Sequence, residues 1–148
     1  MVKHSTFNTQ HATPNIQRNA MTDLPAAPRE YDLEDRLLDY AARIIHLTEA
    51  LARTRAGNLV ADQLLRSGTS PLSNHGEAQA AESPDDFIHK LSVALKELKE
   101  SRRWLRLIVK AELVQETQRI EPLLLETEEL IRIFAASIRT SRERKGTK

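Results

Sequence analysis

The most informative stretch of this chain is QLLRSGTSPLSNHGEA at residues 63–78, followed closely by SPDDFI at residues 83–88. The first stretch has helical spacing, yet small or polar residues occupy the face that should pack. Leu64, Ser67, Pro71, Asn74 and Ala78 recur there at alternating steps of three and four. Pro71 cannot donate a backbone hydrogen bond and its ring crowds the preceding turn, so a kink or a local break is predicted in this second helix.

The composition of the chain points to packed helices. Its 148 residues fit one domain, 40% of them are hydrophobic and only 4% are aromatic, which is typical of an all-α protein. Cysteine is absent, so disulfides and thiolate metal sites are excluded. No apolar run reaches the roughly 20 residues that span a bilayer, and the N-terminus lacks the apolar segment of a signal peptide. We expect a soluble, cytoplasmic protein with no membrane partner.

Four amphipathic patterns follow one another from Asp32 onward. The apolar stripes comprise Leu33, Leu37, Tyr40, Ile44, Leu47 and Leu51 in the first, Phe87, Leu91, Ala94, Leu98, Ser101, Leu105 and Ile108 in the third, and Ile120, Leu124, Thr127, Ile131, Phe134 and Ile138 in the fourth. The second pattern runs through Leu59, Val60 and Leu64 into the stretch quoted above. Asp32 and Ser83 are placed to cap the first and third helices. The second is expected to begin near Thr54, and the fourth near Thr117 with Pro122 in its first turn. Short connections favour antiparallel neighbours, so the sequence predicts an antiparallel up-down-up-down four-helix bundle.

The two ends of the chain differ from this bundle, which is expected over residues 31–141. Residues 1–30 carry few large apolar side chains and are expected to form a disordered N-terminal extension. Met21 offers an alternative start of translation within it. Residues 142–148 are interpreted as a basic flexible tail, which either adds to a basic surface or remains a mobile end.

Further apolar positions lie beside the stripes. They are Leu38 and Ile45 in the first helix, Ile88 and Leu95 in the third, and Leu123 and Leu130 in the fourth. Stripes this wide suit either a monomer with a broad core or a further face for self-association. We favour a homo-oligomer.

The polar groups of the second helix need hydrogen-bond partners if they are buried. Ser67, Ser70 and Asn74 most simply serve a structural role, because buried polar groups can set the register of a bundle or the geometry of an oligomer. The alternative is that they contact a ligand or a nucleic acid.

A set of residues shared by the second and third helices carries a family resemblance. The set comprises Arg66, Ser67, Ser70, Asn74, Glu77, Ala78, Ser83, Phe87, Leu91, Ala94 and Glu100. In order and spacing it resembles the small bacterial proteins encoded by intervening sequences within 23S ribosomal RNA genes, a family that includes the accessory proteins of diversity-generating retroelements. The resemblance covers residues 31–141. It implies a four-helix bundle, a ring-shaped homopentamer, and a basic surface that binds nucleic acid or a reverse-transcriptase partner.

The third helix offers a separate argument for a polyanionic partner. Its candidate nucleic-acid-binding residues are Lys96, Lys99, Arg102, Arg103, Arg106 and Lys110, of which all but Arg102 follow one stripe. Such a stripe concentrates positive potential, and phosphate contacts need little more than that. Glu97 and Glu100 lie close, however, and Lys96 can pair with Glu100. A partner protein with an acidic face and a simply solvated helix therefore remain the alternatives.

Trp104 lies off the core stripe of the same helix. It is expected to shield the bundle edge or to anchor a subunit contact. Base stacking is the less favoured alternative, because stacking usually involves more than one aromatic ring.

No group of residues predicts catalysis, a metal site or a cofactor. His46, His75 and His89 each lie near an acid, but none belongs to a repeated ligand pattern, so all three are expected to be exposed. There is no nucleophile elbow, no cysteine nucleophile and no glycine-rich phosphate loop. An enzyme is therefore not expected.

Overall fold

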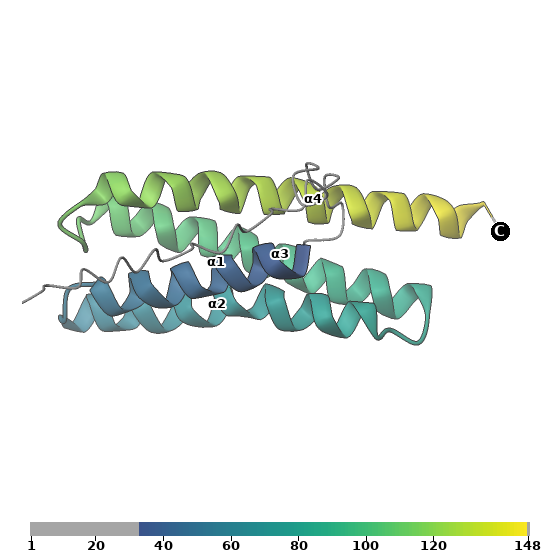
Figure 1. Cartoon of the computed structure of the whole chain (residues 1–148), viewed down its shortest axis with the longest axis horizontal. Helices are drawn as coiled ribbons and strands as arrows, with labels where there is room; N and C mark the ends of the chain where they lie inside the picture. The colour runs from purple at the N-terminus through teal and green to yellow at the C-terminus, as the bar shows by residue number, and fades with distance from the viewer. Residues whose placement is uncertain (1–32, 148) are drawn as a thin grey trace, which may run out of the picture.

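The computed structural model describes residues 33–147, which form a bundle of four α-helices (Figure 1). The helices are α1 (Leu33–Ala50), α2 (Arg55–Gln79), α3 (Pro84–Lys110) and α4 (Glu121–Gly146), and a short 3-10 helix, η1 (Thr117–Ile120), precedes the last of them. No strand occurs in this part of the chain. The predicted all-α four-helix bundle is confirmed.

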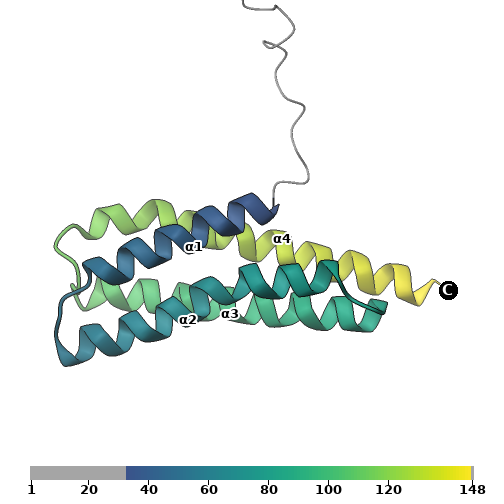
Figure 2. The ribbon, with the colours of Figure 1, turned by 60° about the horizontal axis from the view of Figure 1, so that its bottom comes forward.

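Successive helices lie antiparallel and pack in the order α1 on α2, α2 on α3, and α3 on α4 (Figure 2). The packing of α1 against α4 is the loosest of the four sides. Helix α1 is also the shortest of the four, with 18 residues against 27 in α3, a difference of about 13 Å at 1.5 Å per residue. Figure 1 shows that the N-terminal end of α1 lies well short of the connection between α2 and α3.

The helix starts follow local chemistry. The Thr54 side chain accepts a hydrogen bond from the Gly57 N–H at 3.1 Å, and the Ser83 hydroxyl accepts one from the Asp86 N–H at 3.1 Å. Both contacts satisfy backbone donors that a helix leaves unpaired at its N-terminus. Pro122 lies in the first turn of α4, as predicted. The proposed cap at Asp32 lies outside the described residues, as do the N-terminal extension and Met21.

Two boundary predictions need correction. Helix α2 runs without interruption from Arg55 to Gln79, so the predicted local break at the buried Pro71 is wrong. The alternative, a kink, stays a prediction, which follows from the one backbone hydrogen bond that proline cannot donate. Helix α4 continues to Gly146, so most of the segment interpreted as a flexible tail is helical. Lys145 near its end is paired with Asp85 at the start of α3, which holds the two helix ends together.

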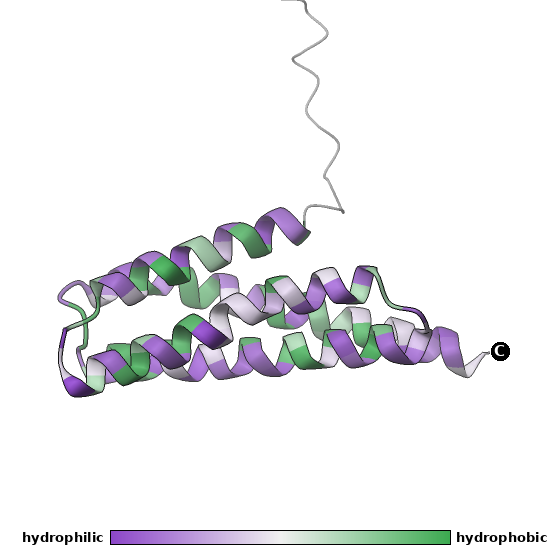
Figure 3. Cartoon of the chain, turned by 90° about the horizontal axis from the view of Figure 1, so that it is seen from below, coloured by the Kyte–Doolittle hydropathy of each residue, from purple (hydrophilic) through white to green (hydrophobic). Residues whose placement is uncertain are grey.

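The core consists mostly of the predicted stripe residues, with α4 as the main exception. Leu123 and Leu130 belong to the core rather than to an additional face, whereas Leu124 is only partly buried. The buried arc of α4 is wider than a single stripe because the helix faces α1 on one side and α3 on the other. Leu38 and Ile45 of α1 are exposed. Figure 3 shows hydrophobic residues, in green, alternating with hydrophilic ones along the ribbons of the helices.

Candidate nucleic-acid interface

The predicted basic stripe lies on the outer surface of α3. Lys96, Lys99, Arg103, Arg106 and Lys110 are all exposed. From the first to the last is 14 residues, or about 21 Å along the helix axis. A row of cations of this length can meet successive phosphates of one nucleic-acid strand.

The acids that could have neutralised this stripe face the other way. Arg66 of α2 lies between Glu97 and Glu100 of α3, donating to the Glu97 carboxylate at 2.9 Å and to Glu100 as well. The expected pair between Lys96 and Glu100 therefore does not form. No carboxylate of residues 33–147 makes an ion pair with any of the five stripe cations.

Arg102 differs from the other predicted cations. Its guanidinium donates to both oxygens of Glu128 in α4 at 3.2 Å, and it is partly buried where α3 and α4 meet. Because Glu128 compensates its charge within the bundle, Arg102 links α3 to α4 and is not a free cation of the stripe.

Helix α4 adds a cation that the sequence analysis assigned to the tail. A surface hollow of about 360 Å³ is lined by Lys96, Lys99 and Arg103 of α3 and by Arg142 of α4. Arg103 also lines a second hollow of about 830 Å³, which extends past Arg106 and Lys110 toward the start of α4. We refer to the five stripe cations together with Arg142 as the α3–α4 basic face.

The family-type residues of α2 mainly hold helices together. The Ser101 hydroxyl donates to Ser67 at 2.9 Å, and both side chains are fully buried. Glu77 pairs with Lys90 of α3 at 2.7 Å, which raises the pKa of that lysine. The remaining polar groups serve α2 itself, since the Asn74 amide donates to the hydroxyl and the carbonyl of Ser70 at 2.9 and 3.0 Å. These contacts agree with the structural role favoured for the motif.

A buried layer of hydroxyls crosses the bundle, with one contributed by each helix. Tyr40 of α1 lies 2.7 Å from the Thr127 hydroxyl of α4, and the Ser67–Ser101 pair joins α2 to α3. All four side chains have no solvent exposure. Burial raises the pKa of Tyr40 to about 12, although the Thr127 and Ser101 hydroxyls act in the opposite direction. The signal in the sequence was the presence of Ser101 and Thr127 on otherwise apolar stripes.

Gly68 sets how closely α1 and α2 approach. A Cβ at this position would lie 2.7 Å from both Cγ atoms of Ile44 in α1. The position tolerates no larger side chain unless Ile44 moves, so the small-residue character of α2 reflects close packing of the helices.

Trp104 is partly buried against the core, and its indole N–H donates to Glu100 at 3.2 Å. The ring therefore closes the edge between α2 and α3 beside the Arg66 ion pairs, on the opposite flank of α3 from the basic stripe. The predicted shielding role fits this position better than base stacking within the α3–α4 basic face.

One histidine prediction is wrong. His46 and His89 are exposed, but His75 is only 8% exposed, because it lies on the inner face of α2 with its ring edge against Phe134. Burial lowers its pKa, and its Nδ1 has no hydrogen-bond partner. Within the described part of the chain, no cluster of His, Asp and Glu could hold a metal ion.

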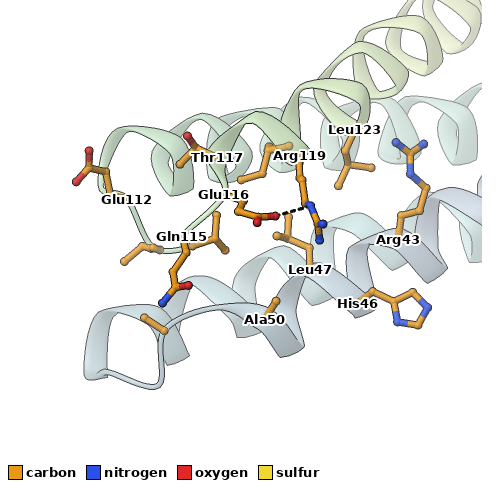
Figure 4. A pocket seen from close by; sticks show the side chains of 14 residues that line it. Arg43, His46, Leu47, Ala50, Glu112, Gln115, Glu116, Thr117, Arg119 and Leu123 are labelled. Carbon is orange, nitrogen blue, oxygen red and sulfur yellow. Dashed lines mark ion pairs between the residues drawn. The ribbon is translucent and has the colours of Figure 1, made fainter.

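A third hollow lies at the end of the bundle where α3 connects to α4, between α1 and that connection. It measures about 1050 Å³ and has Leu47, Leu123 and neighbouring apolar residues as its floor. Figure 4 shows Arg43, His46 and Arg119 around it, with Arg119 paired to Glu116. Cations and acids mix along this rim, whereas Glu121 is the one acid among residues 33–147 that lines either hollow of the α3–α4 basic face. Among the described helices, none is both long and apolar enough to traverse a membrane.

Comparison with known proteins agrees with this architecture. A crystal structure of a protein of unknown function from the S23 ribosomal protein family of Bacteroides thetaiotaomicron VPI-5482 superposes with a TM-score of 0.66 at 34% sequence identity, covering 72% of this chain and 94% of that one. No curated protein matches. Residues 29–136 match the sequence profile of the 23S rRNA-intervening sequence protein family. The chain therefore belongs to the family of 23S rRNA-intervening sequence proteins.

Proposed function

We propose that this protein is a non-enzymatic nucleic-acid-binding protein that contacts the phosphate backbone of RNA or DNA through the α3–α4 basic face. The observation that carries the proposal is the separation of charges on α3. Glu97 and Glu100 pair with Arg66 on one flank of α3. The five stripe cations on the other flank make no ion pair within residues 33–147. With a net charge of only +1, the chain relies on this segregation rather than on overall charge.

A salt titration tests the proposal. Labelled duplex RNA, duplex DNA and a single strand are titrated with the full chain in fluorescence anisotropy between about 50 and 200 mM salt. For duplex DNA, each phosphate contact contributes about 0.9 to the slope of log K against log salt. The Lys99→Glu/Arg103→Glu variant should bind at least about tenfold more weakly and with a slope shallower by about 2, because two contacts are removed.

A matched control is the charge reversal Arg119→Glu. Arg119 is also an exposed cation, but it lies beside α1 rather than in the α3–α4 basic face. Equal losses per reversed charge from Arg119→Glu and from the double reversal would mean that only net charge matters and would contradict the proposal.

The second candidate is an adaptor that binds an acidic surface of another protein, such as a reverse transcriptase of the kind that the family resemblance implies. The same basic face supports it, because an acidic protein surface and a phosphate backbone are both polyanionic. No binding of any nucleic-acid probe, together with binding of such a protein that Lys99→Glu/Arg103→Glu abolishes, would favour the adaptor.

We further propose that the protein assembles as a homo-oligomer, a pentamer by family resemblance. The surface that supports this is an apolar patch on the α2–α3 side, where Leu59 and Leu107 are exposed beside the partly buried Trp104. Assembly would repeat the basic face and add avidity for a long polyanion. Light scattering should give a multiple of 16.8 kDa that falls in Leu59→Gln/Leu107→Gln and persists in Leu125→Gln. A monomeric mass for the unaltered chain would contradict this assembly.

A further inference from the structure

The surface formed by α1 and α2 carries apolar residues that no part of the described bundle covers. Leu38 and Ile45 of α1 are 49% and 44% exposed, and Leu65 of α2 is 38% exposed. On each helix two of these residues lie seven positions apart. The pair on α1 is Leu38 and Ile45, and the pair on α2 is Leu65 and the partly buried Leu72. Because seven residues are nearly two turns, each pair forms a short rail along its helix, about 10 Å long.

The two rails belong to one surface. Helices α1 and α2 are antiparallel neighbours, and Gly68 of α2 packs closely against Ile44 of α1. Ile45 follows Ile44 on the outward side, and Leu65 and Leu72 flank Gly68 by three and four residues on α2. Two parallel apolar rails with small residues between them form a seat for one further helix, the helix-in-groove arrangement.

The charged residues that lie within one turn of the two rails, on the same helix face, are acids. Glu34 and Glu49 of α1 and Asp62 of α2 are exposed and make no ion pair with any group of residues 33–147. We call these three acids together with Leu38, Ile45, Leu65 and Leu72 the α1–α2 acidic face.

Three arginines of the two helices are engaged with acids. Arg36 is paired with Glu126 of α4, Arg66 with Glu97 and Glu100 of α3, and Arg43 lies 4.0 Å from Asp39. Arg55 at the very start of α2 and Arg53 just before it are exposed, so cations stand only at one end of the face. An isologous contact between two copies through this face would set acids against acids, which costs free energy. A ring uses heterologous contacts, in which this face would meet a different surface of the next copy, and the oligomer mass of variants in this face distinguishes that case.

We propose that the α1–α2 acidic face is a docking site for a cationic amphipathic helix of a partner protein. Leucine-type residues of that helix would pack on the two rails, and Lys or Arg on its flanks would meet Glu34, Glu49 and Asp62. The site is separate from the α3–α4 basic face, so the chain can hold a basic protein segment and a polyanion at the same time.

The test uses a labelled synthetic peptide of about four turns, with Leu at helical a and d positions and Lys on both flanks, titrated with the full chain in fluorescence anisotropy. A second peptide carries Glu in place of Lys. The Lys peptide should bind and the Glu peptide should not, and higher salt should weaken the binding. Leu38→Gln/Ile45→Gln and Glu34→Gln/Glu49→Gln/Asp62→Asn should each weaken it by about tenfold or more.

Controls separate this site from general stickiness and from self-association. Leu125→Gln removes a leucine of α4 that is even more exposed, at 62%, and should leave peptide binding unchanged. The altered side chains are exposed, so an unchanged melting temperature and unchanged RNA binding show that each variant is folded. Equal binding of both peptides, or equal loss in Leu125→Gln, overturns the proposal. A fall in oligomer mass in Leu38→Gln/Ile45→Gln also overturns it, because the face would then be an interface between copies.

Discussion

Thr127→Val should be among the most destabilising isosteric changes in this chain, because of where the hydroxyl protons lie. Thr127 Oγ1 is 2.7 Å from the Leu123 carbonyl and 2.7 Å from the Tyr40 hydroxyl. A hydroxyl has one proton to donate. Since the carbonyl can only accept, Thr127 donates to it, and Tyr40 must donate to Thr127.

The two partners therefore respond unequally to mutation. Thr127→Val leaves the Tyr40 hydroxyl, which has no solvent exposure, without this acceptor, at a cost of about 1 to 3 kcal/mol. Tyr40→Phe removes the donor while Thr127 keeps its carbonyl partner, at a cost of about 1 kcal/mol. The double variant leaves no unpaired group, so it should cost about 1 kcal/mol as well, well below the sum of the two single changes.

Urea unfolding followed by circular dichroism measures the four free energies of unfolding. Thr69→Val serves as the matched control, because Thr69 makes the same hydrogen bond to a carbonyl one turn earlier, at 2.7 Å, but lies near the surface with no side-chain partner. That control should change stability by less than about 0.5 kcal/mol. Additivity of the Tyr40 and Thr127 changes within about 0.5 kcal/mol would refute the assigned proton arrangement.

Three other predictions concern stability. Gly68→Ala should destabilise by about 1 kcal/mol, since overpacking against Ile44 outweighs the gain in helix propensity, and its sign should reverse in an Ile44→Ala background; urea midpoints that shift equally in both backgrounds would contradict this. Burial lowers the pKa of His75 below its value in the unfolded chain, so the stability that neutral His75 contributes is complete above about pH 6.5 and is lost as the pH falls through the folded pKa. His75→Leu should therefore flatten the change in melting temperature between about pH 7.5 and 5, and curves that run parallel for the variant and the unaltered chain would contradict this. Ser83→Ala should cost about 1 kcal/mol by removing the α3 cap, measured by thermal unfolding, whereas Ser83→Asp should retain most of the stability.

Local sequence was sufficient to predict the helices because their signals act over one or two turns. Stripes at three-four spacing predicted α1 to α4 closely, and Ser83 followed by Pro84 marked the start of α3. The basic stripe of α3 was predictable for the same reason, since a single helix fixes the direction of every side chain on it. Family-type residues in α2 pointed correctly to the family of the chain.

Contacts between helices were decided by the tertiary structure. Spacing along α3 suggested that Lys96 would pair with Glu100, but Arg66 reaches Glu100 from α2 and so leaves the stripe cations exposed. Three further features depend on which helices are neighbours. They are the burial of His75, the position of Arg142 beside the α3 cations, and the hydroxyl layer through Tyr40. Periodicity determines which face of a helix is apolar, but which polar side chains meet across the bundle is set by the order and depth at which those faces pack.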